Sequence, residues 1–243
     1  MYDEQTVLVL SGTSDSGRAV AETVADAGGT VGFTYNSASD DAEALLNELD
    51  GDGHEAWSCD VTDPEETEAV IDEAFDAIGP IDSLVYTVGV IARSSITDTD
   101  VDDWQRHLDV NVTGAFNTIK AAAPKFEEQG HGAMVAVSAC DGIMRSSDLA
   151  AYDASKQALI ALVEEAAREL GPSGVRANVV SPGFIRDPDA LSEDAIDGLL
   201  EQQPYKQLTT PQAIANACLF LCSDLASTTT GAVLPVDSGL SLE

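Results

Sequence analysis

Short apolar runs alternate with helix-forming segments along this whole chain, and no other feature constrains its fold as strongly. Thr6–Leu10 reads TVLVL, a fully apolar run typical of a strand in a parallel sheet that is buried on both faces. Strands that are joined through helices run parallel, and the helices cover both faces of the sheet. We therefore predict a single α/β domain over residues 1–243, with a doubly wound, seven-stranded parallel sheet. The expected strands cover residues 6–10, 30–35, 55–59, 83–88, 133–138, 176–180 and 232–236, and the expected helices cover 18–27, 41–49, 63–78, 104–125, 155–170 and 211–222.

Residues 187–203 form the one irregular stretch in the second half of the chain. They follow the sixth expected strand, on the side where a doubly wound sheet binds its ligand. We interpret residues 187–210 as a lid over a small-molecule substrate. A plain surface insertion is the alternative.

The charge of the chain is strongly negative. Asp and Glu number 43 against 11 Lys and Arg, a formal net charge of −32, and no Lys or Arg lies between Arg18 and Arg93. Such a surface repels nucleic acid and anionic membranes, so neither is an expected partner. Because concentrated salt screens self-repulsion, we expect a salt-adapted protein from a halophilic cytoplasm. The alternative is an ordinary acidic protein.

The cysteines and histidines give no sign of a metal site. Their spacing matches no common ligand pattern, and Cys218 and Cys222 lie one turn apart on an apolar helix, where buried packing is the ordinary role. The chain begins with no charged-then-apolar leader, and no apolar run reaches the 18 residues typical of a membrane span. These features predict a cytoplasmic protein without a metal.

Tyr152 and Lys156 lie four residues apart, so their side chains share one face of a helix. An ammonium beside a phenol favours the ionised phenol and lowers its pKa from about 10. Such a tyrosine can pass a proton to or from a substrate oxygen near neutral pH. Taken alone, this spacing more often reflects a solvated lysine beside a half-buried tyrosine.

Five further segments, in one order along the chain, make this pair informative. Together with the pair, these segments are Gly12–Gly17, Cys59-Asp60-Val61, Asp109–Gly114, Tyr152-x-x-x-Lys156, Ser181–Ile185 and Val236–Gly239. In this order the chain resembles the short-chain dehydrogenase/reductase family over nearly its whole length. It is most similar to the 3-oxoacyl-carrier-protein and acetoacetyl-CoA reductases, through Tyr35-Asn36-Ser37 and Phe220–Asp224. The resemblance implies a Rossmann-like domain and an NAD(P)-dependent oxidoreductase.

The resemblance also implies roles for three residues in catalysis. Tyr152 would be the general acid or base at the substrate oxygen. Lys156 would hold the cofactor ribose and lower the pKa of Tyr152. Asn111 would anchor a water that links Lys156 to solvent, although a structural role in a helix or turn is the alternative for Asn111.

Further residues would contact the cofactor. Asp60 would accept a hydrogen bond from the adenine amino group, beside the Val61 backbone, and the Gly89 backbone would pass close to the cofactor. Residues Pro182, Gly183 and Ile185 would line the nicotinamide. Asp60 is equally suited to capping the turn toward Asp63, and Gly183 to a simple turn.

The glycine loop departs from the family pattern Gly-x-x-x-Gly-x-Gly. Here Gly12 is followed by four other residues and then Gly17, so the loop is one residue short and one glycine is lost. We still expect Gly12, Ser14, Asp15 and Gly17 to lie against the pyrophosphate, where backbone N–H groups at a helix N-terminus bind anions. Asp15 adds a negative charge near that phosphate.

Two more departures affect the centre of the predicted site. Tyr86-Thr87-Val88-Gly89 stands where the family commonly has Asn-Asn-Ala-Gly. The catalytic serine of the family aligns with Ala139, and Ser138 lies one residue early. Because neighbouring strand residues point to opposite faces, Ser138 can replace that serine only through a bulge or a strand end. With that condition, Ser138 is our candidate for the substrate hydrogen bond.

The cofactor preference is predicted from the end of the second strand. NAD-specific relatives carry an acidic residue there for the ribose hydroxyls, whereas Tyr35-Asn36-Ser37 has none, which favours NADP(H) over NAD(H). Arg18 is the one cation near in sequence that could bind the 2′-phosphate. The expected contacts in this region are Arg18, Tyr35, Asn36 and Ser37.

The leading hypothesis is a reductase of a carbonyl on an acyl thioester or similar small molecule, with hydride from the nicotinamide and the proton from Tyr152. The departures at the loop, at Tyr86-Thr87 and at Ala139 motivate a second hypothesis. It is a weakly active or inactive subunit that binds a ligand or supports a partner in a mixed oligomer. A redox enzyme acting on sugars or polyols is the third. The resemblance also implies a homo-oligomer, a tetramer or a dimer.

Overall fold

The computed structural model describes residues 5–140, 148–185 and 193–242, and these form the predicted parallel sheet. Its strand order is β3-β2-β1-β4-β5-β6-β7, and every neighbouring pair is parallel. The single doubly wound, seven-stranded domain is thus confirmed. The strands are β1 (Thr6–Leu10), β2 (Thr30–Tyr35), β3 (Glu55–Ser58), β4 (Ser83–Tyr86), β5 (Gly132–Val137), β6 (Val175–Pro182) and β7 (Val233–Val236).

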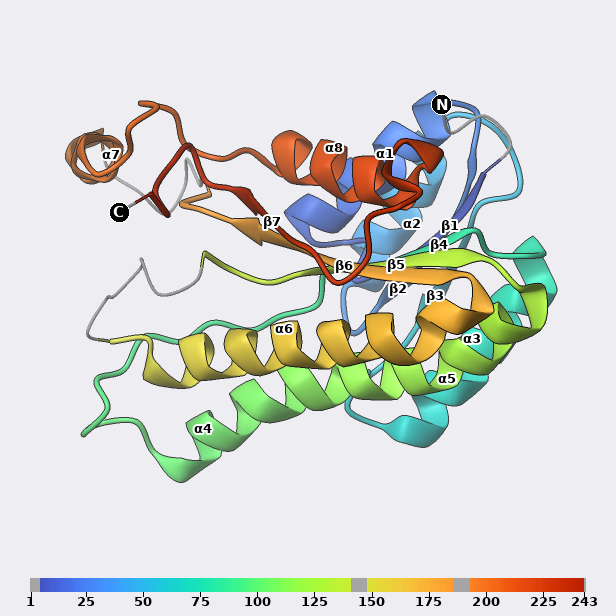
Figure 1. The fold of residues 1–243 in the computed structure, drawn as a ribbon, viewed down its shortest axis with the longest axis horizontal. Helices are drawn as coiled ribbons and strands as arrows, with labels where there is room; N and C mark the ends of the chain where they lie inside the picture. The colour runs from blue at the N-terminus through green and yellow to red at the C-terminus, as the bar shows by residue number, and fades with distance from the viewer. Residues whose placement is uncertain (1–4, 141–147, 186–192, 243) are drawn as a thin grey trace.

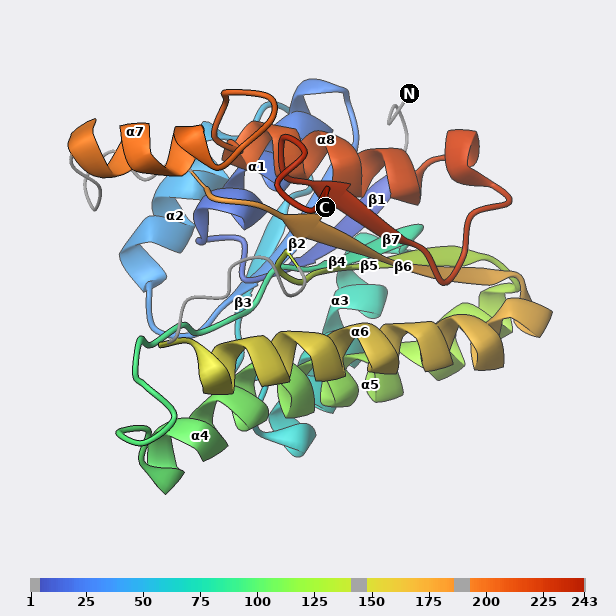
Figure 2. The same cartoon turned by 60° about the vertical axis from the view of Figure 1, so that its left-hand side comes forward.

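Helices cover the two faces of the sheet in separate layers (Figures 1 and 2). One layer holds α1 (Asp15–Asp26), α2 (Ser39–Glu48) and α8 (Pro211–Cys222). The other holds α3 (Pro64–Ile78), α4 (Val101–Leu108), α5 (Gly114–Gln129) and α6 (Ala150–Leu170). Each face of the sheet has its own apolar core, and alternate residues of β1 contribute to each. Val7 and Val9 pack under the first layer, and Leu8 and Leu10 pack under the second.

The strand order reverses at β1, which pairs with β2 on one side and with β4 on the other. In a doubly wound sheet the ligand crevice opens at such a reversal, beyond the carboxyl ends of the strands. Here that point brings together the loop after β1 and the segment after β4.

Two helices begin earlier than the sequence pattern predicts. The Ser14 hydroxyl caps α1, so that helix starts at Asp15 rather than at Arg18. Helix α6 starts at Ala150 rather than at Ser155, because its first turn consists of two alanines, Tyr152 and Asp153 and lacks the stripe of large apolar residues that marks a helix in a sequence. Tyr152 therefore lies inside the helix, on the same rigid element as Lys156.

The expected helix over residues 104–125 is present but contains an irregular turn. Between α4 and α5 the chain makes the π-helical turn η1 (Asp109–Thr113), in which the Gly114 N–H bonds to Asp109 O. Such turns insert one extra residue into a helix and often occur at functional sites. Asn111 lies within it. Two 3₁₀ turns complete the description, η2 (Gly171–Ser173) and η3 (Asp224–Ala226).

The predicted lid is described only in part, since residues 187–192 lie outside the described residues. The remainder contains α7 (Glu193–Glu201), which stands beyond the carboxyl end of β6 and apart from both helix layers (Figure 1). Ile185 and Thr209 form a bridge at the base of this segment. Of the helices in the described ranges, none combines the length and the hydrophobicity that crossing a lipid bilayer requires.

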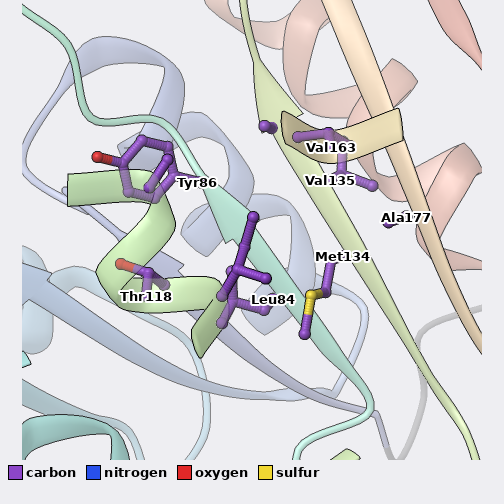
Figure 3. A pocket seen from close by; sticks show the side chains of 10 residues that line it. Leu84, Tyr86, Thr118, Met134, Val135, Val163 and Ala177 are labelled. Carbon is purple, nitrogen blue, oxygen red and sulfur yellow. The ribbon is translucent and has the colours of Figure 1, made fainter. Parts of the chain in front are cut away.

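The apolar core has one small gap on the α5 and α6 side of the sheet (Figure 3). Its space of about 10 Å³ is close to the least that holds one water molecule, and its lining is apolar. It is lined by residues that include Leu84, Met134, Val163 and Ala177, with Tyr86 at one end and its hydroxyl pointing away. We assign it to imperfect packing of the core.

Candidate active site

The loop after β1 is tight despite its missing residue. Ser11 adopts the left-handed conformation with φ of 69°, and the Ser14 hydroxyl donates to Ser11 O at 2.7 Å and accepts from the Gly17 N–H at 3.2 Å. A Cβ on Gly17 would lie 2.1 Å from Ser11 O, so only glycine lets α1 approach the loop this closely. The first N–H groups of α1, at Asp15 and Ser16, have no partner inside the helix. They form a suitable cradle for a pyrophosphate.

Thr87 fastens this loop to the segment after β4. Its hydroxyl donates to Leu10 O at 2.7 Å and lies 3.3 Å from the Ser14 hydroxyl. Thr87 is one of the residues that departs from the family pattern, and here it contacts the shortened loop directly. The two departures therefore occur at one place, where the threonine braces a loop that has lost a glycine.

A hollow beside the loop matches the predicted adenine site. It has a volume of about 360 Å³ including its open mouth, and its lining contains Tyr35, Asn36, Asp60 and Val61. Oδ1 of Asp60 accepts from the Thr62 N–H at 3.0 Å and from the Thr62 hydroxyl at 2.7 Å. Asp60 thus caps the turn after β3, as the structural alternative held, while Oδ2 accepts no hydrogen bond from any described residue. The geometry is compatible with both roles.

Arg18, the one predicted cation for a 2′-phosphate, is already paired. Its Nη1 lies 2.7 Å from Glu48 Oε2 and 3.5 Å from Glu22 Oε1. Both pairs are partly exposed, so each is worth at most about 1 kcal/mol. A phosphate at this position has to compete with two carboxylates.

Lys156 is buried beside the segment after β4. Its Nζ donates to Val137 O at 3.1 Å, and a Cβ on Gly89 would lie 3.0 Å from it. Because Gly89 has no side chain, the space in front of the ammonium stays open. A cofactor ribose would need this space to reach Lys156. Burial lowers the pKa of Lys156 to about 8.

The predicted lowering of the Tyr152 pKa is not found. Burial, with a smaller contribution from Asp153, raises the pKa of Tyr152 to about 12. The Lys156 ammonium lies 5.9 Å from the centre of the phenol ring, and the burial of the phenol is the dominant effect on its pKa. A phenol with this pKa is fully protonated at neutral pH, as a general acid must be before it donates.

Asn111 is completely buried, and its amide makes three hydrogen bonds. Nδ2 donates to Val90 O at 3.0 Å and to the Ser155 hydroxyl at 2.9 Å, while Oδ1 accepts from the Val90 N–H at 2.8 Å. The side chain therefore holds the segment after β4 against α6, which is the structural alternative for this residue. Its predicted role in a water relay stays a prediction.

Tyr86 supports the π-turn that carries Asn111. Its hydroxyl donates to Val110 O at 3.0 Å, and Gly114 makes room for that hydroxyl, since a Cβ there would lie 2.8 Å from it. The burial of this phenol raises its pKa. The departure from Asn at position 86 thus has a specific function in this chain, which is to bind a backbone carbonyl of the irregular turn.

The Ser138 hydroxyl does not point to where the predicted substrate hydrogen bond requires it. Its buried hydroxyl donates to Lys156 O at 3.0 Å. The ladder with β6 continues regularly past it, because the Ser138 N–H bonds to Val180 O and the Cys140 N–H to Pro182 O, each at 2.8 Å. The bulge that the prediction required is therefore absent, and Ala139 occupies the opposite face with no hydroxyl to offer.

The residues predicted to line the nicotinamide lie at the carboxyl end of β6. Pro182 is buried at the end of that strand, and Ile185 is partly exposed beside Thr209. A Cβ on Gly183 would lie 2.8 Å from Asp237 Cα, so Gly183 also permits close contact with the end of β7. Within the described residues, no three His, Cys, Asp or Glu side chains converge as metal ligands would.

Sequence reasoning missed His107, which is buried against Tyr152 with the two ring centres 6.5 Å apart. The available signal was its spacing, because His107 and Asn111 are four residues apart on one helical face. It also missed Ser155, whose hydroxyl connects Asn111 to Tyr152 O at 2.7 Å.

The strand order, the glycine loop and the Tyr152–Lys156 pair together define a doubly wound dinucleotide-binding oxidoreductase domain. A family model described as enoyl-(acyl carrier protein) reductase matches residues 13–241. The 3-oxoacyl-[acyl-carrier-protein] reductase of Staphylococcus epidermidis is 32% identical over 240 residues, 97% of this chain and 98% of the relative. That of Escherichia coli is 32% identical over 241 residues, 98% of each.

Solved structures give the same result. A short-chain type dehydrogenase/reductase from Mycobacterium ulcerans has a TM-score of 0.93 at 29% identity, covering 99% of this chain and 91% of its own. An NAD⁺-bound xylitol dehydrogenase has a TM-score of 0.87 at 28% identity, covering 98% and 99%. The chain belongs to the short-chain dehydrogenase/reductase family, as its sequence motifs predict.

Proposed function

We propose that this protein reduces the carbonyl of a small molecule, a 3-oxoacyl thioester or a similar substrate, to an alcohol with a nicotinamide cofactor. One observation carries the proposal. The protonated phenol of Tyr152 and the buried ammonium of Lys156 both lie on α6, and Gly89 leaves the space for a cofactor beside that ammonium. The 3-oxoacyl reductase activity of the relatives from Staphylococcus epidermidis and Escherichia coli supports the choice of a 3-oxoacyl substrate.

The residues present fit a dinucleotide. The N–H groups that open α1 would hold the pyrophosphate, the hollow beside Asp60 the adenine, and Lys156 the ribose next to the nicotinamide. A bound nicotinamide would supply the hydride. Tyr152 would donate its proton to the oxygen of the carbonyl as that oxygen becomes negative.

The substrate oxygen lacks one expected partner. In this chain Tyr152 would bind that oxygen without a neighbouring serine hydroxyl, because Ser138 donates to Lys156 O and position 139 is alanine. An oxyanion donor is typically worth about 10²–10³ in rate. We therefore expect a slow reductase.

The proposal is tested by adding NADPH and then NADH to the protein in molar KCl and following nicotinamide fluorescence. Acetoacetyl-CoA is then added as the substrate. Binding with turnover supports the proposal. Binding of neither cofactor would contradict it, and binding without turnover of any carbonyl would favour the second hypothesis, a subunit that only binds its ligand.

For the cofactor we propose NADP(H), with Arg18 as the cation nearest the expected 2′-phosphate. Replacing Glu48 with Gln should raise the affinity for NADPH by up to about fivefold, because the carboxylate that holds Arg18 at 2.7 Å is removed. The affinity for NADH should not change. Glu43→Gln is the matched control, since Glu43 lies exposed on the same helix and has no ion pair with Arg18. Equal shifts for both cofactors in both variants would exclude Arg18 from the phosphate site.

We also propose that the protein works in a cytoplasm of high salt. With a net charge of −32, self-repulsion opposes the compact state in dilute buffer. The melting temperature should therefore rise steadily between dilute buffer and 1 M KCl, where the Debye length falls to about 3 Å. Circular dichroism at each KCl concentration measures this. A melting temperature that is no higher in molar KCl would contradict the proposal.

A homo-oligomer, tetramer or dimer, remains our proposal for the assembly. Leu159, Ile160 and Val163 of α6 are buried in the core of the chain itself, so they are not available for a partner. Exposed apolar side chains lie instead on α4 and α5, where Val101, Trp104 and Phe116 face solvent.

A further inference from the structure

His107 makes two hydrogen bonds that fix its protonation state. It lies on α4 with 2% of its surface exposed. Its Nδ1 is 2.7 Å from Asp103 O, and its Nε2 is 3.1 Å from the Ala92 backbone nitrogen. A carbonyl only accepts, and a backbone N–H only donates. The ring is therefore neutral, with its proton on Nδ1 and a lone pair on Nε2.

The same ring contacts the proposed proton donor. The rings of His107 and Tyr152 meet edge to face, with their centres 6.5 Å apart and their planes at 79°. This is a favourable aromatic geometry. The imidazole thus packs against the phenol on the side of α4, while its Nε2 holds the segment after β4.

Two side chains bind the segment after β4, and they come from positions one helical turn apart on α4 and η1. Asn111 bonds to both the N–H and the carbonyl of Val90, and His107 bonds to the N–H of Ala92. The two side chains are at i and i+4 and so share a face. Between them they set the path of the backbone that follows Gly89, in front of Lys156.

We propose that His107 is a positioning residue, and that its neutral Nδ1–H form holds both the Val90–Ala92 backbone and the phenol ring of Tyr152. The part of this proposal that concerns catalysis rests on the proposed function. If Nε2 carried a proton, its N–H would face the Ala92 N–H. Two donors cannot bond to each other, so the hydrogen bond from Ala92 would be lost. The titratable side chains of the elements around His107 include Arg93 in the segment, Asp102, Asp103 and Arg106 on α4, Asp109 on η1, and Tyr152, Asp153 and Lys156 on α6.

The tautomer of the His107 ring can be measured by NMR, with no need for enzymatic activity. The chain has 3 histidines, so ¹⁵N labelling of histidine gives one spectrum with three rings. His54 is an internal control of the opposite kind, because its Nδ1 accepts from the Val31 N–H at 3.1 Å and its Nε2 lies 2.9 Å from Asp50 O. We expect the Nδ1–H tautomer for His107 and the Nε2–H tautomer for His54 at pH 8. His107→Gln assigns the signal. An Nε2–H or doubly protonated His107 would overturn the proposal.

Two variants then test the positioning role. His107→Phe keeps an aromatic edge against Tyr152 but leaves the Ala92 N–H without an acceptor, whereas His107→Gln offers an amide oxygen to it. We expect kcat of the Phe variant to fall about tenfold, with nicotinamide binding within about threefold of wild type, and the Gln variant to recover most of the loss.

The two ways of failing are distinguishable. If the wild-type protein reduces no carbonyl, the proposed function fails, while the ring signals still decide the state of His107. If the wild-type protein is active and both variants match its kcat, the positioning role is wrong.

Discussion

Replacing Tyr152 with Phe should lower kcat for carbonyl reduction by about 10²–10⁴-fold, the range that a general acid contributes. The substitution removes only the hydroxyl, so the ring contact with His107 and the start of α6 should persist. Burial keeps the pKa of this phenol at about 12, so wild-type Tyr152 is protonated and ready to donate at neutral pH. Steady-state consumption of the reduced cofactor with acetoacetyl-CoA in molar KCl measures the loss.

The matched control is Tyr205→Phe, which removes a phenol hydroxyl at a residue that is 68% exposed. Its kcat should stay within about twofold of wild type, as expected for a surface change away from the site. Nicotinamide binding should be retained in both variants. A Tyr152→Phe protein with near wild-type kcat would show that the proton comes from another group.

Restoring a serine at position 139 should raise kcat by up to about 10²-fold. The physical reason is that an oxyanion donor is worth about 10²–10³ and this chain lacks one on the face opposite Ser138. The gain should appear in kcat rather than in cofactor affinity, because the hydroxyl would bind the substrate oxygen as its charge develops. Steady-state kinetics of Ala139→Ser against wild type measures it.

Two further variants separate the possible sources of a gain. Ala139→Val adds bulk at the same position without a hydroxyl and should not raise kcat. Ser138→Ala should lower stability by about 1 kcal/mol, through loss of the bond to Lys156 O, with little effect on kcat. If Ser138→Ala abolishes activity and Ala139→Ser changes nothing, then Ser138 is the donor after all.

The fold could be predicted from the sequence because its signals are local. Apolar runs such as Thr6–Leu10, separated by helices, allow few topologies other than a doubly wound parallel sheet. Individual helix ends were harder to predict, because a capping serine at Ser14 and a first turn of α6 with few large apolar residues leave only weak patterns. The structure places the glycine loop after β1 and the Lys156 ammonium against Val137 O at the end of β5, and the roles of these residues stay predictions.

The chemistry of the site was less predictable, because it depends on contacts between distant segments. The Tyr152 pKa was expected to fall and instead rises, since burial outweighs an ammonium that lies 5.9 Å from the ring centre. The pairing of Arg18 with Glu48 joins α1 to α2 across 30 residues of sequence. The bond from Tyr86 to Val110 O depends on a π-turn that no sequence pattern marks. Each of these features depends on a contact that no local sequence pattern reveals.

The most direct test of the central claim is isotope transfer. Wild-type protein is incubated in molar KCl with acetoacetyl-CoA and with NADPH or NADH that carries deuterium at the reactive carbon, and the product is examined by mass spectrometry. We predict a 3-hydroxyacyl product with a single deuterium on its carbinol carbon, formed by wild type and nearly absent with Tyr152→Phe. Tight cofactor binding with no deuterium in the product from this or any other carbonyl substrate would contradict the claim that the site is a reductase.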